Sequence, residues 1–395
     1  MLSWAFPPRT TGGVAAQVAG LSTALANAGH DVVVLTVADR VAELDAKPPA
    51  GVRVLRTLID LPWLPPAEAV TRVASANHAV TKLGNRFTGE LEGWVPDVVH
   101  GHDWQLGWAA DTLACRYDVP FVLTMHGTER VRHGGQLPLG HPTDIHSIEW
   151  WLAFQADRLT SPTRFIVEQL VTGFELAADH VVHIPNGIDP DLWRPAGTPT
   201  VPTGPRPPLV AAWGRVRYEK GFQVLARAMH ELRSRMPDVH SVIAGRGSYL
   251  PELQSQVDVE GVSDIVELAG YLDEPGLRAL VHRAGCVVIP SLYEPFGIVA
   301  LEALAAGAPL IVARTGGLAE LITGTEAGVT FEPGNPDDLA DAIEQVLTNQ
   351  DFANILVANA RELVEHTYAW SAIARTTSTL YDEVTAMGRR SAATR

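Results

Sequence analysis

Short apolar runs alternate with helical patterns along almost the whole 395-residue chain, and this alternation limits the folds that it can adopt. Runs such as Asp31–Thr36 (DVVVLT) are almost continuously apolar and rich in β-branched residues. Such runs are typical of parallel strands that are covered on both faces. The preceding segment, Gly13–Ala28, is rich in Ala and Leu and is followed by Gly29, a common helix terminator. The pattern therefore predicts strand–helix–strand units with right-handed crossovers.

The same pattern occurs twice, on either side of residues 185–208, which contain eight prolines. A segment so rich in proline cannot continue a sheet and is expected to be a linker. The length also favours two domains, because a single hydrophobic core stops growing well below it. We predict two Rossmann-like α/β domains, residues 1–184 and 209–370, followed by a helical segment at 371–395. The expected strands are Asp31–Thr36, Val52–Leu55, Asp97–His100, Phe121–Met125, Leu209–Trp213, Val239–Ala244, Ile265–Leu268, Gly285–Pro290 and Leu310–Ala313. The expected later helices are Phe222–Arg235, Pro275–Ala284, Ile298–Ala306, Asp337–Thr348 and Ser371–Met387.

The first strand is unusually short, since only Met1–Trp4 precede the Pro7-Pro8 turn. We interpret this as a first strand that lacks a few N-terminal residues. The N-terminus has no basic segment followed by a long apolar run, so a secretory signal is not expected. No stretch reaches the roughly 20 apolar residues of a membrane span. A cytoplasmic protein is expected, and contact with the inner face of the membrane is left open.

The charge and the cysteines exclude several classes of protein. The net charge is -15 and the acidic excess is spread over both halves, which argues against nucleic-acid binding because that depends on clustered cations. Cys115 and Cys286 are the two cysteines and have no CxxC spacing, so a disulfide framework or zinc ribbon is not expected.

The expected strand Leu209–Trp213 is followed by two cations between glycines, Arg215 and Lys220. Only three of the 30 basic residues are lysines, so Lys220 stands out as a compact ammonium in an Arg-rich chain. Cations just after a strand suit a diphosphate, although a solvated turn with surface ion pairs is the alternative. The segment is not GxxxxGK[ST], which disfavours a P-loop NTPase.

A second candidate segment follows the expected strand Gly285–Pro290. Glu294 lies on the turn, and Glu302 lies two helical turns after it. The backbone around Phe296, Gly297, Ile298 and Val299 forms a helix N-terminus whose free N–H groups suit an anion. Glu294 can then face a sugar, and Glu302 can accept hydrogen bonds from a ribose diol. The alternative is that Glu294 caps the helix and Glu302 is solvated.

With these residues the chain resembles retaining GT-B glycosyltransferases of glycosyltransferase family 4. Glu294 and Glu302 match the E-x7-E motif, and Gly12-Gly13 and Arg215 with Lys220 match its partners. Within the family the resemblance is to actinobacterial enzymes of the glycogen-synthase and methylglucose-polysaccharide α-glucosyltransferase kind. It implies a nucleotide-diphospho-sugar donor held by Gly13, the two cations and both carboxylates. It also implies that the terminal helix packs back on the first domain.

The histidines of the first half end two of its expected strands. His100 and His102 lie at i and i+2, on one face of the strand as two metal ligands would, but no third ligand has a firm spacing. The resemblance instead implies that His102 contacts the donor sugar and that His126 is an active-site residue. A buried, hydrogen-bonded histidine is the alternative for each.

Tryptophans are concentrated in the first half, where Trp4, Trp104, Trp150 and Trp151 adjoin expected strand ends or helices. Aromatic residues are usually part of a core, but indole also stacks well on sugars. These residues and Asp103 are therefore candidates for binding a carbohydrate or glycolipid acceptor.

The sequence and the resemblance together predict a retaining hexosyltransferase without an obligatory metal or other cofactor. Catalysis would depend on Glu294, His126, Arg215 and Lys220. UDP-glucose or ADP-glucose is the favoured donor; GDP-mannose is the alternative, and a noncatalytic nucleotide-sugar-binding protein is less favoured. Arg246 stands where the family often has an acidic residue, which leaves the nucleotide base open. An NAD-dependent oxidoreductase is disfavoured because no GxGxxG follows the first strand.

Overall fold

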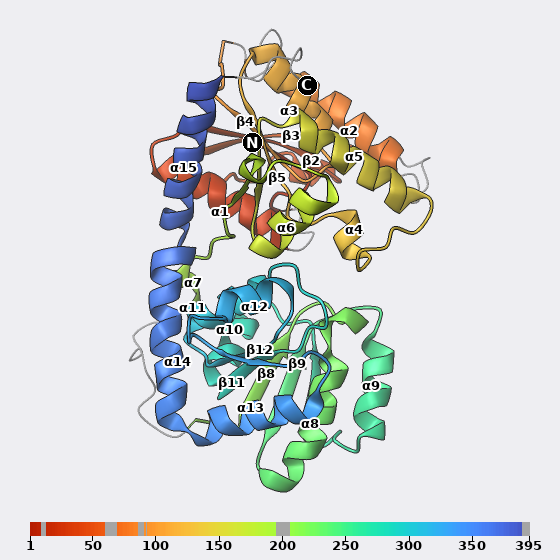
Figure 1. Cartoon of the computed structure of the whole chain (residues 1–395), viewed down its shortest axis with the longest axis vertical. Coiled ribbons are helices and arrows are strands. Elements are labelled where there is room, and N and C mark those ends of the chain that lie inside the picture. The colour runs from red at the N-terminus through yellow and green to blue at the C-terminus, as the bar shows by residue number, and fades with distance from the viewer. Residues whose placement is uncertain (9–12, 60–68, 86–90, 92, 195–205, 389–395) are drawn as a thin grey trace. The chain divides into compact units, whose positions relative to one another are not determined.

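The computed structural model describes residues 1–8, 13–59, 69–85, 91, 93–194 and 206–388. These residues form two compact units, each built on one parallel sheet (Figure 1). The first unit contains Met1–Gly187 and Trp370–Arg395, and the second contains Ile188–Ala369. This confirms the predicted α/β class with two Rossmann-like sheets.

The sheet of the first unit has seven strands within the described residues, in the order β3-β2-β1-β4-β5-β6-β7. Its strands are β1 (Leu2–Ser3), β2 (Val32–Ala38), β3 (Val52–Leu58), β4 (Val99–His102), β5 (Phe121–Thr124), β6 (Arg158–Ser161) and β7 (Val181–His183). Its helices are α1 (Gly13–Asn27), α2 (Ala69–Leu83), α3 (Gly107–Tyr117), α4 (Glu129–Arg132), α5 (His141–Gln155), α6 (Arg164–Gly173) and α15 (Trp370–Met387).

Successive side chains of a strand point to opposite faces of its sheet, and β2 shows the result. Val33 and Leu35 pack into one core with residues of α2, α3 and α5. Val32 and Val34 pack into another core with residues of α1 and α15. The seven residues of β2 are all buried, which explains its almost continuous apolar run.

The sheet of the second unit has six strands within the described residues, in the order β10-β9-β8-β11-β12-β13. Its strands are β8 (Leu209–Trp213), β9 (His240–Ala244), β10 (Val266–Gly270), β11 (Cys286–Ile289), β12 (Leu310–Ala313) and β13 (Val329–Phe331). Its helices are α7 (Pro190–Trp193), α8 (Phe222–Arg235), α9 (Leu250–Val259), α10 (Glu274–Arg283), α11 (Ile298–Ala306), α12 (Gly316–Ile322), α13 (Pro336–Thr348) and α14 (Gln350–Leu363). Strand β8 lies between β9 and β11, so the loops after these three strands share one edge of the sheet.

The expected linker differs from what the structure describes. Residues 195–205 lie outside the described residues. Earlier in the segment, Ile188 and Trp193 are buried in the core of the second unit. Proline does not prevent this, because Pro190 is in the first turn of α7, where its missing N–H costs no hydrogen bond. Residues 188–194 therefore belong to the folded second unit, whereas 185–187 belong to the first.

Candidate active site

The loop after β8 brings Lys220 beside the loop after β11. Gly221 caps α8 in the left-handed region, at a φ of 68°. A Cβ on Gly221 would lie 1.8 Å from the backbone oxygen of Pro290, so the two loops approach as closely as only glycine allows. Within the described residues, the exposed Arg215 of the same loop has no ion-pair partner. Its guanidinium is therefore available to an anionic ligand.

Lys220 and Glu294 form an ion pair in the second unit. The Nζ of Lys220 lies 2.5 Å from Oε2 of Glu294, and the Ser291 hydroxyl donates to the same oxygen at 3.5 Å. The two charged side chains are largely buried, with 19% and 12% of their surfaces exposed. The backbone oxygen of Glu294 accepts a hydrogen bond from the N–H of Gly317, which anchors the turn. Two residues that the sequence singled out separately are thus brought together.

Helix α11 begins at Ile298, directly after this turn, with no side chain capping its N-terminus. Gly297 has a φ of 92°, and a Cβ there would lie 2.4 Å from Cδ2 of Leu318. Phe296 is buried in the core, so only its backbone is available to a ligand. The N–H groups of the first turn, including that of Val299, attract an anion because they carry the positive end of the helix dipole.

Glu302 lies further along α11 and is bonded to the last residue of β8. The indole Nε1–H of Trp213 donates to Oε2 of Glu302 at 2.9 Å. Burial raises the pKa of Glu302 to about 7, and the nearby carboxylate of Glu274 raises it further. This carboxyl therefore titrates near neutral pH, which the sequence did not show. The indole bond was also missed, although the position of Trp213 at the end of a strand facing the same edge was a usable signal.

Three histidines of the first unit lie together at the carboxyl ends of β4 and β5. The ring of His102 stacks on that of His100 at 4.4 Å between centroids, and its Nδ1 is 3.3 Å from Nε2 of His126. His100 is further bonded through its two ring nitrogens to Tyr381 and Thr124. Burial lowers the pKa of all three histidines, so they are neutral at physiological pH.

The same histidines line a pocket of the first unit. Its other lining residues are Gln17, Leu21, Thr124, Thr160, Ile184, Pro185, Asn186, Trp370, Ile373 and Thr377. The buried Nε2 of His102 has no hydrogen-bond partner in the described structure, so a ligand there would satisfy it. Gly13 is the first residue of α1, whereas Gly12 lies outside the described residues. No group of three or more His, Cys, Asp or Glu residues within the described ranges is arranged to hold a metal ion.

The candidate acceptor residues are not all placed alike. Trp104 is buried in the core of the first unit with 6% of its surface exposed, so a sugar-stacking role does not fit it. Trp4 is half-buried and packs against the same core. Trp150 and Trp151 are on α5 with 47% and 37% exposed. The Oδ1 of Asp103 accepts the backbone N–H of His126 at 2.9 Å, which is a bond within the protein.

The two parallel Rossmann-like sheets are those of a glycosyltransferase of the GT-B type. Residues 11–192 match the family described as Glycosyltransferase Family 4, and residues 201–363 match Glycosyl transferases group 1. A relative named glycogen synthase, from Mycobacterium tuberculosis, is 36% identical over 394 residues, covering 96% of this chain and 93% of that protein. The chain therefore belongs to glycosyltransferase family 4, as the resemblance implied, and is an enzyme.

Solved structures show the same fold. Sucrose-phosphate synthase from Thermosynechococcus elongatus has a TM-score of 0.81 at 23% identity, covering 98% of each chain. Anabaena HepE, in complex with UDP and glucose, has a TM-score of 0.74 at 17% identity, covering 97% of this chain and 98% of that chain. Among the described residues no helix is long and apolar enough to cross a membrane.

Proposed function

We propose that the protein transfers glucose from a nucleotide-diphospho-glucose to a hydroxyl of a carbohydrate or glycolipid, with retention of the α configuration. The observation that carries this proposal is the Lys220–Glu294 pair beside the uncapped N-terminus of α11. The names of the glycogen synthase relative and the UDP and glucose of the HepE complex support a glucosyl donor.

The cations have a direct role in this reaction. An ammonium has three N–H donors, so Lys220 can keep its bond to Glu294 while it also binds a diphosphate oxygen. Arg215 and the first turn of α11 add positive charge at the same edge of the sheet. Together they stabilise the charge that grows on the leaving diphosphate, so no obligatory metal is required.

The carboxylates and the histidines take different parts of the donor. Glu294 accepts hydrogen bonds from the hexose, and its charge stabilises positive charge at the anomeric carbon. Glu302 accepts hydrogen bonds from the ribose. In the first unit, His102 contacts the donor sugar and His126 lies near the reacting carbon, as the family resemblance implies. The leaving diphosphate accepts the proton of the acceptor hydroxyl in a front-face displacement.

A donor panel tests the proposal. Thermal shift and release of nucleoside diphosphate are measured with UDP-, ADP- and GDP-linked glucose and mannose, each with and without an α-glucan acceptor. Acceptor-dependent release from a glucose donor, with an α product by NMR, is the expected result. Turnover of GDP-mannose alone would identify a mannosyltransferase. Binding without turnover of any donor would identify a binding protein.

A further inference from the structure

Two carboxyl groups hold the segment that carries His126, one at each end. Asp103 accepts the backbone N–H of His126 at 2.9 Å. Three residues later, Glu149 of α5 accepts the backbone N–H of Glu129, at 3.1 Å to Oε1 and 2.9 Å to Oε2. The segment 126–129 joins β5 to α4, so its conformation decides where the His126 ring lies.

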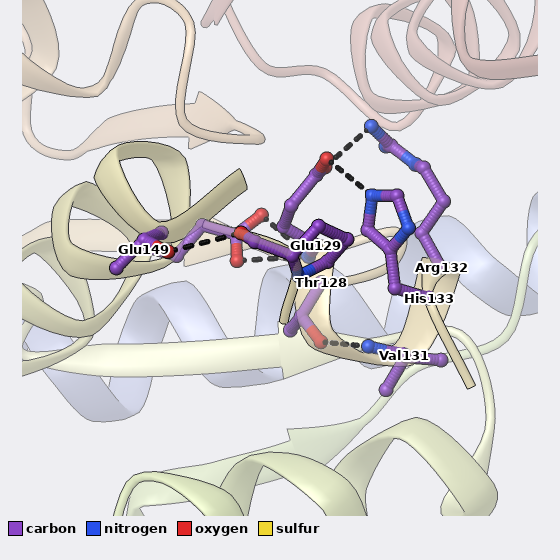
Figure 2. Close-up of polar contacts among 8 residues, drawn as sticks. Thr128, Glu129, Val131, Arg132, His133 and Glu149 are labelled. Atoms are coloured by element: carbon purple, nitrogen blue, oxygen red, sulfur yellow. Dashed lines mark hydrogen bonds and ion pairs between the residues drawn. The ribbon is translucent and has the colours of Figure 1, made fainter. Parts of the chain in front are cut away.

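Glu149 is directed at the backbone and not at the charged side chains nearby. Figure 2 shows its carboxyl group pointing from α5 to the Thr128–Glu129 backbone. The side chain of Glu129 points the other way, and its two oxygens bind Arg132 at 2.7 Å and His133 at 3.1 Å. Glu149 thus serves a single backbone donor among the described contacts.

A carboxyl group in this position is costly to the fold. Glu149 is only 2% exposed, and burial raises its pKa to about 8. The charged groups that act on it are Glu129 and Arg132 of α4 and Asp103 of the loop after β4, of which the two acids raise the pKa further and Arg132 lowers it. An apolar residue would fill the site without desolvating a carboxyl, so the residue is better explained by what its bond fixes.

We propose that Glu149 is a positioning residue for sugar transfer, which holds segment 126–129 through the Glu129 N–H and so fixes the position of the His126 ring within the first unit. This proposal rests on the proposed function. The Glu149 bond acts at one end of the segment, and the Asp103 bond acts at the other. Between them, Thr128 caps the N-terminus of α4, because its hydroxyl accepts the Val131 N–H at 3.2 Å. Displacing a reacting group by about 1 Å can cost on the order of 100-fold in rate.

The test compares Glu149→Ala and Glu149→Gln in the full chain, with Glu168→Ala on the exposed face of α6 as the control. The alanine variant should lower kcat by roughly 10- to 100-fold, with the donor dissociation constant within about twofold of wild type. The glutamine variant should restore most of the rate, because its amide oxygen still accepts the N–H. The control should match the wild type.

Hydrogen–deuterium exchange of the peptide covering 126–131 is measured on the same proteins. Faster exchange in Glu149→Ala, but not in Glu149→Gln or the control, is expected. An alanine variant that keeps full kcat, or that exchanges like wild type, would overturn the proposal. The proposal would also be overturned if Glu149→Ala and Glu149→Gln lowered kcat to the same extent and lowered the melting temperature to the same extent. That result would mark a structural role. If the wild type transfers no hexose, the proposed function fails, while the exchange data still decide whether Glu149 holds the segment.

Discussion

Glu302 is expected to make donor binding depend on pH near neutrality. Its pKa is about 7 in the folded protein, against 4.5 ordinarily, because burial disfavours the carboxylate despite the hydrogen bond from Trp213. A ribose diol donates hydrogen bonds and therefore prefers the ionised form. If only that form binds well, about one tenth of the protein is competent at pH 6 and about nine tenths at pH 8. The donor dissociation constant should then fall about tenfold between these two values of pH.

The ionisation of Glu302, which should strengthen donor binding as the pH rises, should at the same time lower the free energy of unfolding. Because its folded pKa is raised, the stabilising contribution is present below pH 4.5 and is lost as the pH rises through 7. The difference between the two pKa values corresponds to about 3 kcal/mol of unfolding free energy. Glu302→Gln removes the charge and keeps an acceptor for the Trp213 indole, so it should stabilise the second unit at pH 8.

Calorimetric titration with the intact nucleotide-sugar, between pH 5.5 and 8.5, measures the donor dissociation constant. The intact donor is used because it has no terminal phosphate that titrates in this range. Urea unfolding at the same pH values measures the free energy of unfolding. The glutamine variant should bind the donor more weakly at pH 8 and show no tenfold dependence on pH. If the variant and the wild type have the same pH slope, then Glu302 is not the titrating group and its assignment to the ribose loses its support.

Three further substitutions have defined outcomes. Lys220→Ala should lower kcat at least about 100-fold with the fold intact by circular dichroism, because it removes a preorganised cation from the leaving group, whereas the exposed control Lys47→Ala should be silent. Glu294→Gln should lower the single-turnover rate far more than it weakens the donor, and an unchanged rate would contradict its role at the hexose. Gly221→Ala should lower the unfolding free energy of the second unit by at least about 2 kcal/mol in urea, since its Cβ meets the backbone oxygen of Pro290. The control Gly261→Ala should cost less, because Gly261 also has a positive φ but has open space where the Cβ would lie.

The apolar strands could be predicted from the sequence, and the more polar ones could not. Strand β8 has the expected bounds, Leu209–Trp213, because its apolar run ends at a glycine. Strands β6, β7 and β13, at Arg158–Ser161, Val181–His183 and Val329–Phe331, were missed because each includes polar positions. The equally short β12 is wholly apolar and was predicted as Leu310–Ala313. Strand β4 is shifted by two residues, to Val99–His102 in place of the expected Asp97–His100, and so includes His102. Hydrophobic patterns locate apolar strands, but strands with polar positions depend on their neighbours in the sheet.

The candidate site could also be predicted only in part from the sequence. Lys220 and Glu294 were recognised through cations and a carboxylate placed after strands, because strand ends in a parallel sheet meet at one edge. Their direct pairing depends on β8 lying next to β11, which a single sequence does not reveal. Glu149 was missed for another reason: a glutamate in a helix is ordinarily solvated, and only the packing of α5 against the segment after β5 buries it.

The division of the chain has a consequence for the order in which the protein is synthesised and folded. The first unit is discontinuous, because α15 supplies Ile373 and Leu380 to its core only after the whole second unit has been translated. The ends of the second unit are held together by the bridge between Ile188 and Ala369. A ribosome therefore releases all of the second unit before it releases the residues that complete the first. Until then, the part of the first unit's core that α15 covers stays exposed. Chaperones should therefore bind most strongly to nascent chains that stall before Trp370.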